Sequence, residues 1–330
     1  MRYTLTLLLF FLLDFQATAQ DSSRTRIPFF EPAPKFAPVR FWAVTGGLTV
    51  GYTATSIGLA KAWYSEYDRG KFHFFNDWYG WRQMDKFGHL MTNYFESKWV
   101  GQLYHWAGIP RKKAAWIGFG GGMLFQLTVE MMDGFSDAWG FSMSDIGFNA
   151  IGASAYLGQE LLWEEQRVLF KISSHRPRYS TAPIKALNSN ETTSLKERAA
   201  DLYGTSIPEL FFKEYNGETI WASVNIASFL NKKPKWLPAF VNVAVGYGIE
   251  NVFGAERNKW YNDNISVFEA PADVRRHSQI FLSLDIGFER IPTKSKALKS
   301  FFALLNVFKV PFPAVEFNTL GKVKLKPFYF

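Results

Sequence analysis

DKFGHLMTNYFESKWVGQLYHW, residues 85–106, places polar residues at helical spacing within an otherwise apolar and aromatic segment. One stripe on one helix face is formed by residues at i, i+4, i+7 and i+11, namely Asp85, His89, Thr92 and Glu96. Ionisable groups in apolar segments are costly unless they meet one another, a metal or a ligand. The stretch therefore predicts a helix whose polar face meets partners in the interior.

Two further segments carry polar stripes at the same spacing. Their members are Gln126, Glu130 and Asp133 in a helix predicted over residues 114–133, and Asp145 and Asn149 in a helix predicted over residues 143–165. Ser142 precedes the last helix in the position of a cap. Gly152 leaves room for a neighbouring helix. Three helices thus each present carboxylates on one face, and we expect these faces to meet.

The residue types in these stripes suit two kinds of chemistry. Carboxylates together with one imidazole bind divalent cations such as Mg²⁺, Mn²⁺ or Zn²⁺. Alternatively, His89 acts as a general base whose basicity is set by Asp85 or Glu130. The sequence predicts catalytic candidates (His89, Asp85 and Glu130), a substrate-binding candidate for an anionic group (Lys86), and a polar network (Glu96, Asp133, Asp145 and Asn149).

The same residues also suit a structural role as a polar lock between helices. His89 then bonds to Asp85 one turn away, and Asn149 ties two helices together through its amide. Asp145 belongs to a helix start and Asp133 to the turn after a helix. The chain has no G-x-S-x-G, H-E-x-x-H or P-loop motif that would decide between the two roles. Both interpretations stay open at this point.

Composition favours a protein that works at a membrane–water interface. Aromatic residues make up 18% of the chain, while the hydrophobic fraction of 48% is too low for a protein with many membrane spans. The net charge of +8 favours contact with anionic surfaces such as lipid head groups. No nucleic-acid partner is expected, because no basic stripe with groove-reading motifs occurs.

The N-terminal residues 1–19 have the features of a cleavable signal peptide. Arg2 gives a positive start, an apolar run follows, and Ala17-Thr-Ala19 supplies a small-residue cleavage site. Residues 20–40 are then expected to form an extended leader. The chain contains no cysteine, so it has neither a disulfide nor a lipid-acceptor thiol. We expect a mature protein in the periplasm or at the outer membrane.

Residues 41–64 form a long, weakly polar segment with four glycines. The segment has the length of a membrane span, but its threonine and glycine content makes it a poor one. The pattern favours a helix that packs closely on its neighbours through small residues. Together with the three polar-striped helices it makes a helical domain predicted over residues 41–170.

The second half of the chain changes its hydrophobic period from 3.6 toward two. Residues 171–204 are rich in Ser, Asn, Thr and Pro and are predicted to be a linker. Alternating apolar residues then predict strands near 220–227, 241–248 and 280–289, and residues 296–309 predict an amphipathic helix. The expected fold class is α+β: an N-terminal helical bundle with a polar inter-helix site and a C-terminal antiparallel β-rich region over residues 205–330.

The polar stripes resemble the YfiM-like family of predicted periplasmic lipoproteins. The resemblance rests on Asp85-Lys-Phe-Gly-His89, the runs 130–136 and 139–142, and Asp145 to Gly152, and covers about residues 42–160. A looser similarity reaches the VanZ-like membrane proteins, through a D-K-x-x-H start and a D-x-x-x-N-x-x-G helix. The resemblance implies a periplasmic location and supplies no established activity.

These observations predict an exported cell-envelope protein, an outer-membrane-associated structural or assembly factor. Its expected partners are the outer membrane or its lipids and other envelope proteins. The alternative is a hydrolase, dependent on a metal or on His89, that acts on lipid or cell-wall intermediates. Residues 205–330 extend beyond the short family members, and we expect this extension to replace the lipid anchor.

Overall fold

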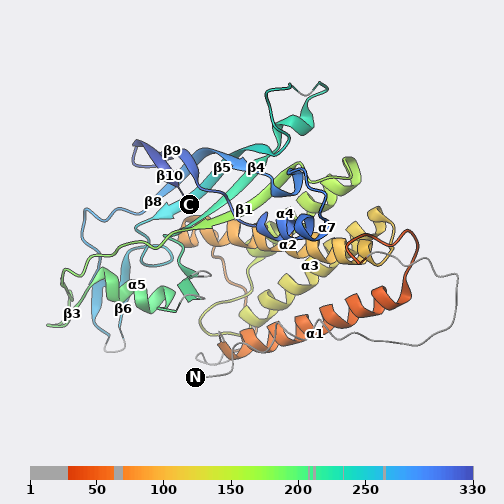
Figure 1. Ribbon diagram of the computed structural model, residues 1–330. Helices are drawn as coiled ribbons and strands as arrows, with labels where there is room; N and C mark the ends of the chain where they lie inside the picture. Colours follow the sequence, from red (N-terminus) through yellow and green to blue (C-terminus); the bar gives the residue numbers. More distant parts are fainter. Residues whose placement is uncertain are drawn as a thin grey trace.

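The computed structural model describes residues 29–62, 70–206, 209–210, 213–232, 234–262 and 265–329. The predicted signal peptide and the first part of the leader lie outside the described residues. The chain forms a helical layer and a six-stranded antiparallel sheet, which confirms the predicted α+β class (Figure 1). Among the described helices, none is both long and apolar enough to cross a membrane.

Three helices form the layer that carries the polar stripes: α2 (Met84–Trp106), α3 (Arg111–Asp133) and α4 (Met143–Leu162). Pro110 precedes α3, and the Ser142 side chain caps α4 by accepting a hydrogen bond from the backbone of Asp145. Gly152 is required for close packing, because a Cβ there would lie 2.0 Å from the carbonyl oxygen of Leu90. The predicted close approach of a neighbouring helix at Gly152 is therefore confirmed, and that helix is α2.

Helix α1 (Pro38–Ala62) lies along the edge of this layer (Figure 1). It is joined to the layer by hydroxyl contacts of Thr45 with Tyr104 at 3.1 Å and of Tyr52 with Thr128 at 2.7 Å. A Cβ placed on any of its four glycines would meet nothing within 4 Å. The prediction of close helix packing at these glycines is therefore wrong. The glycines face away from the helices that α1 contacts.

The sheet has the strand order β1-β4-β5-β8-β9-β10, with every neighbouring pair antiparallel. The strands are β1 (Val168–Ser174), β4 (Glu218–Val224), β5 (Val241–Glu250), β8 (His277–Ile286), β9 (Phe312–Asn318) and β10 (Val323–Tyr329). The short helical turn η2 (Ile226–Phe229) lies between β4 and β5, and η3 (Phe288–Arg290) and helix α7 (Lys296–Leu305) lie between β8 and β9. A further turn, η1 (Gly80–Gln83), leads into α2.

The sheet curls so strongly that the chain before β9 returns to the free edge of β1. Ile172 of β1 donates its backbone N–H to Val307 and accepts one from Lys309, both at 2.9 Å. The concave face is lined by polar and aromatic side chains. Lys171, Trp221, Phe281, Asp285 and Glu316 are all buried there. We call this lining the sheet interior.

The convex face of the sheet is apolar and only partly covered. Helix α2 packs on its β1, β4 and β5 part, where Met84, Ile172 and Ile220 share one core cluster. The uncovered part carries two rows set by the strand register, Val245–Leu282–Val315–Leu325 and Tyr247–Ile280–Phe317–Val323. Ile280, Leu282 and Leu325 are exposed at 53%, 48% and 72%. We call these rows the apolar outer face.

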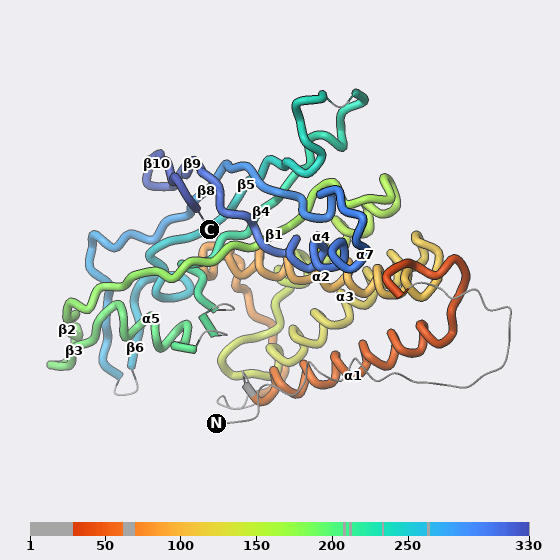
Figure 2. Tube along the Cα trace, viewed as in Figure 1, coloured from red at the N-terminus to blue at the C-terminus, as the bar shows by residue number. Residues whose placement is uncertain are grey.

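The segment predicted as a linker, residues 171–204, differs from that expectation. It begins inside β1 and contains β2 (Ile184–Lys185), β3 (Thr192–Thr193) and α5 (Leu195–Tyr203). With β6 (Lys259–Tyr261) and β7 (Val267–Glu269) these elements gather at one end of the molecule (Figure 2). The pattern hides β1 because its inward residues, Lys171 and Ser173, are polar.

Candidate functional site

The first turn of α2 brings Lys86 into the interior of the helical layer. The Lys86 side chain is 1% exposed. Its Nζ lies 2.6 Å from a carboxylate oxygen of Asp77, 2.6 Å from one of Asp145 and 3.2 Å from one of Asp85. A buried ammonium with three carboxylate neighbours is compensated and hydrogen-bonded. Lys86 is therefore occupied by the protein's own groups and is not placed to meet an anionic substrate.

Asp77 anchors this lysine to the start of α4. Its Oδ1 accepts hydrogen bonds from the hydroxyls of Ser142 at 2.7 Å and Ser144 at 2.8 Å. Burial raises the pKa of Asp77, but the hydrogen bonds and charge of Lys86 and the serine hydroxyls outweigh it and lower that pKa to about 2. We call Lys86, Asp77, Ser142 and Ser144 the lysine cluster. Each of its polar groups has a partner.

His89 lies one turn further along α2 in a different environment. Its Nε2 is 3.7 Å from Glu130 Oε1, 3.8 Å from Asp145 Oδ2 and 3.9 Å from Asp85 Oδ1. Hydrogen bonds between nitrogen and oxygen span about 2.7–3.2 Å, so none of these contacts is one. Two ligands at about 2.0–2.2 Å from a common ion lie up to about 4.4 Å apart, so the spacing suits a shared cation. We call these four residues the histidine centre.

Several polar atoms of the histidine centre lack partners among the described residues. Glu130 is 1% exposed, and its Oε1 accepts no hydrogen bond, whereas its Oε2 accepts one from the backbone of Ser142 at 3.1 Å. The Nδ1 of His89 is also buried without a partner. Such atoms are costly in a folded protein unless a ligand, an ion or water satisfies them.

Burial and mutual repulsion oppose full ionisation of Glu130 and Asp145 in the histidine centre. Burial raises the pKa of Glu130 to about 8 and, with Asp85 adding to it, that of Asp145 to about 6, despite the opposing effect of His89. Burial lowers the pKa of His89, but the charges of Asp85, Asp145 and Glu130 outweigh it, so the net shift is upward. The centre therefore favours an additional proton or cation.

A cavity of about 300 Å³ opens beside this centre. His89, Asp85 and Asp145 lie on its polar side, and Asp133 also lines it. Its other walls include four aromatic side chains, namely Phe75, Trp81, Trp139 and Tyr215. A polar floor with aromatic walls suits a ligand that has both a polar and an apolar part. Asp85, His89 and Asp145 also offer ligand atoms that all lie within 4.8 Å of one another.

The remaining residues of the predicted polar network lie deeper between the helices. Glu96 accepts two hydrogen bonds from the Gln126 amide, at 3.0 and 2.9 Å, and burial raises the pKa of Glu96 to about 8. The backbone carbonyl of Asn149 accepts a hydrogen bond from Asn93 at 3.0 Å, while the Asn149 side-chain amide has no partner among the described residues. These residues join the helices away from the cavity.

Two residues of the site escaped prediction from the sequence. Asp77 lies in an irregular aromatic segment before α2, and Tyr215 lies 130 positions beyond Asp85, to which its hydroxyl donates a hydrogen bond at 2.9 Å. Neither position belongs to a periodic stripe. The one available signal for Asp77 was a lone carboxylate within a dense aromatic run.

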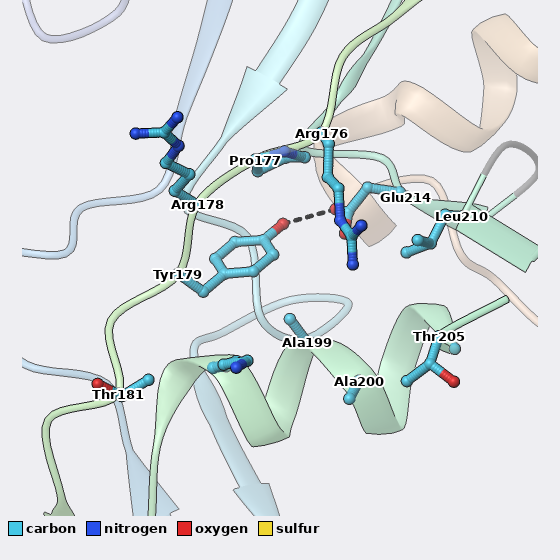
Figure 3. Close-up of a pocket in the computed structure, with 12 residues that line it drawn as sticks. Arg176, Pro177, Arg178, Tyr179, Thr181, Ala199, Ala200, Thr205, Leu210 and Glu214 are labelled. Atoms are coloured by element: carbon cyan, nitrogen blue, oxygen red, sulfur yellow. Dashed lines mark hydrogen bonds between the residues drawn. The ribbon is translucent and has the colours of Figure 1, made fainter. Parts of the chain in front are cut away.

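A second cavity, of about 410 Å³, lies near α5 (Figure 3). Arg176 points into it, and the Tyr179 hydroxyl donates a hydrogen bond to Glu214 at 2.6 Å. Its aliphatic lining includes Ala199, Ala200 and Leu210. None of the residues predicted as site residues lines this cavity. The Tyr179–Glu214 pair can therefore serve as a control for tyrosine–carboxylate contacts in the histidine centre.

Comparison with known proteins gives one match. A family model described as "Predicted periplasmic lipoprotein (DUF2279)" matches residues 74–159, which include α2, α3, the lysine cluster and the histidine centre. None of the curated proteins and none of the solved structures compared with the chain matches it. The site-bearing part of this chain is thus similar to an uncharacterised family of predicted periplasmic proteins.

Proposed function

We propose that the histidine centre binds a divalent cation and that the protein is an exported envelope hydrolase acting on lipid or cell-wall intermediates. The observation that carries the proposal is the position of His89 Nε2, with three carboxylate oxygens at 3.7–3.9 Å beside an accessible cavity. A polar lock alone would bring these groups into hydrogen bonds, as it does around Lys86.

The residues divide the chemistry among them. His89, Asp85 and Asp145 are the ligands of the cation, and Glu130 serves as a fourth ligand or as a general base. A divalent cation lowers the pKa of a bound water and so supplies a nucleophile near neutral pH. The cavity gives the substrate access, and its aromatic walls accept an apolar part of that substrate. One imidazole among carboxylates suits Mn²⁺ or Zn²⁺.

Titration calorimetry with Mn²⁺ and Zn²⁺ tests this proposal. We expect one ion per chain in the wild type, and an affinity lower by on the order of 100-fold in His89→Ala. His105→Ala is the matched control, because His105 lies on the same helix and bonds to the carbonyl of Ile109 instead. Equal ion binding by the wild type and His89→Ala would refute the site.

The location belongs to the same proposal. The similarity of residues 74–159 to predicted periplasmic lipoproteins supports work in the periplasm, and the sequence of residues 1–19 supports export. The likeness of the D-K-x-x-H and D-x-x-x-N-x-x-G patterns to YfiM-like and VanZ-like proteins supports a place in the envelope. Neither likeness identifies a substrate. The proposed substrate class, lipid or cell-wall intermediates, is therefore supported by the lining of the cavity alone.

A second candidate function is a structural or assembly role at the outer membrane. The apolar outer face favours it, because Ile280 and Leu282 on β8 and Leu325 on β10 remain exposed. Large exposed apolar patches mark binding surfaces for proteins or membranes. The net charge of +8 suits an anionic lipid surface.

Deleting residues 205–330 would not test this role cleanly, because β1 would lose β4 and the core shared with α2. Lys substitutions at Ile280 and Leu282 are sharper, since both side chains point outward. Co-sedimentation with vesicles of phosphatidylglycerol and phosphatidylethanolamine should fall in this double variant. Lys substitution at exposed Trp236, which lies outside the rows, is the control. Unchanged sedimentation would exclude this face as the membrane contact.

A further inference from the structure

The turn that leads into α2 has an uncommon backbone. Trp81, Arg82 and Gln83 follow one another with φ of 49°, 49° and 66°. None of them is glycine, so each adopts a left-handed conformation that its side chain disfavours. Such conformations persist where the surrounding structure over-determines them, and they cluster at functional sites. Helix α2 begins directly after this turn, at Met84, and carries Asp85, Lys86 and His89.

The contacts that hold this turn come from the C-terminal half of the chain. The backbone N–H of Trp81 donates to the carbonyl of Ala255 at 2.7 Å, and Arg82 Nε donates to the hydroxyl of Ser278 at 2.8 Å. The hydroxyl of Tyr247 donates to the carbonyl of Arg82. Of these three groups, Tyr247 belongs to β5, Ser278 belongs to β8, and Ala255 lies between β5 and β6.

Tyr215 extends this hold to the histidine centre itself. Its ring packs edge-on against Trp81, with ring centroids 5.6 Å apart. Its hydroxyl donates to Asp85 Oδ1 at 2.9 Å, and this is the same oxygen that lies 3.9 Å from His89 Nε2. Tyr215 thus contacts both the strained turn and the carboxylate of Asp85, which closely follows that turn. A carboxylate ligand held by an outer partner keeps a fixed orientation.

We infer that Tyr215 and the turn Trp81–Gln83 are a positioning device through which the C-terminal half of the chain sets the location of Asp85 Oδ1 in the histidine centre. The inference rests on the proposed function. The similarity to the periplasmic family covers residues 74–159, so Tyr215, Tyr247 and Ser278 lie beyond it. In this chain the site therefore depends on residues that the matched part does not contain.

Tyr215→Phe removes only the hydroxyl and tests the device. We expect its Mn²⁺ affinity to fall about 10- to 100-fold, the range found when outer partners of metal ligands are removed. Tyr247→Phe, which loosens the turn, should show a smaller loss. Tyr179→Phe is the matched control, because its hydroxyl binds Glu214 in the second cavity (Figure 3). Tyr215→Phe should cause no further loss in an Asp85→Asn background.

A second readout separates this inference from the proposed function. In the metal-free protein, the NMR titration midpoint of His89 should move in Tyr215→Phe and stay in place in Tyr179→Phe. Absence of Mn²⁺ binding in the wild type would remove the proposed function, whereas a moved His89 midpoint would still support positioning. A Tyr215→Phe protein with wild-type Mn²⁺ affinity and an unmoved midpoint would overturn the inference.

Discussion

Two buried lysines of this protein, Lys171 in the sheet interior and Lys86 in the helical layer, have different neighbourhoods. Lys171 pairs with Asp285 at 2.8 Å, and both side chains have no exposure. Asp285 also accepts hydrogen bonds from the Ser223 hydroxyl and the Val310 backbone, at 2.6 and 3.1 Å. This pair lines neither the cavity beside the histidine centre nor the cavity near α5.

In the helical layer, Lys86 is also paired with carboxylates, but the neighbouring groups are not all satisfied in this way. Lys86 has three carboxylate neighbours, but two of them, Asp85 and Asp145, also face His89. The distances from His89 Nε2 to these carboxylates are too long for hydrogen bonds. Glu130 Oε1 has no hydrogen-bond partner among the described residues, and a cavity opens beside the centre. Buried charge by itself therefore does not mark a site. What distinguishes one is buried charge that the protein leaves unsatisfied next to an accessible space.

The largest expected effect breaks the satisfied pair in the sheet interior. Asp285→Ala leaves Lys171 as an uncompensated buried charge, so we expect a loss of about 3–5 kcal/mol in the free energy of unfolding. Guanidinium denaturation measures it. The double variant Lys171→Met with Asp285→Leu removes both charges and should recover most of the loss. A loss below about 1 kcal/mol in the single variant would show that the pair is not structural.

The second prediction separates the two halves of the helical layer. Lys86→Met strands the carboxylates of Asp77, Asp85 and Asp145 and should also cost about 3–5 kcal/mol. His89→Ala removes no hydrogen bond to any of the described residues and should cost only about 1–2 kcal/mol, while lowering the affinity for the ion by on the order of 100-fold. Thermal unfolding and calorimetry on the same samples give both numbers. Equal destabilisation by the two variants would favour a polar lock for the whole region.

The third prediction concerns pH. Glu130 ionises near pH 8 in the folded protein and near 4.5 when unfolded, so the metal-free folded state binds the extra proton between these values. Its stability should therefore fall as pH rises from about 4.5 to 8, by at most about 1.4 kcal/mol per pH unit for this group.

Glu130→Gln removes this contribution, and urea denaturation across the pH range checks it. Glu96 and Glu218 have raised pKa values of about 8 as well, so the slope should become smaller without vanishing. Asp77 acts in the opposite direction, because its pKa is lowered, and its contribution is lost only as pH falls from about 4 toward 2. An identical slope in Glu130→Gln would contradict the assignment.

The smallest effect is expected from a hydroxyl of the lysine cluster. Ser144→Ala removes one hydrogen bond to Asp77 and should cost about 0.5–1.5 kcal/mol. Because the Ser144 hydroxyl bonds to Asp77 and Ser142, which are not ligand candidates, Mn²⁺ affinity should stay within about two-fold of the wild type. A large loss of affinity would mean that the lysine cluster and the histidine centre act as one unit.

The sequence was sufficient for the elements whose periodicity is regular. The predicted ranges of α2, α3 and α4 agree with the structure, and Asp85, His89, Glu130 and Asp145 come together because helical spacing fixes their faces. Lys86 escaped a correct interpretation. It lies one position from the Asp85 stripe, and its burial depends on Asp77, which comes from an irregular segment that no periodicity places.

The sheet shows a second limit. Alternation predicted strands with one apolar face, and β5 and β8 have it. It could not reveal that part of the apolar face stays exposed while Lys171 and Asp285 are buried. A period of two assigns residues to two faces, but which face is enclosed depends on curling and on pairing of distant charges. Tyr215 was missed for the same reason, since only the tertiary fold brings it to Asp85.

Anomalous diffraction from crystals grown with Mn²⁺ tests the central claim most directly. A single strong peak should lie about 2.0–2.4 Å from His89 Nε2 and from carboxylate oxygens of Asp85 and Asp145, with Glu130 as the fourth candidate. A histidine centre without a peak at millimolar Mn²⁺, with His89 instead hydrogen-bonded to its carboxylates, would contradict the account.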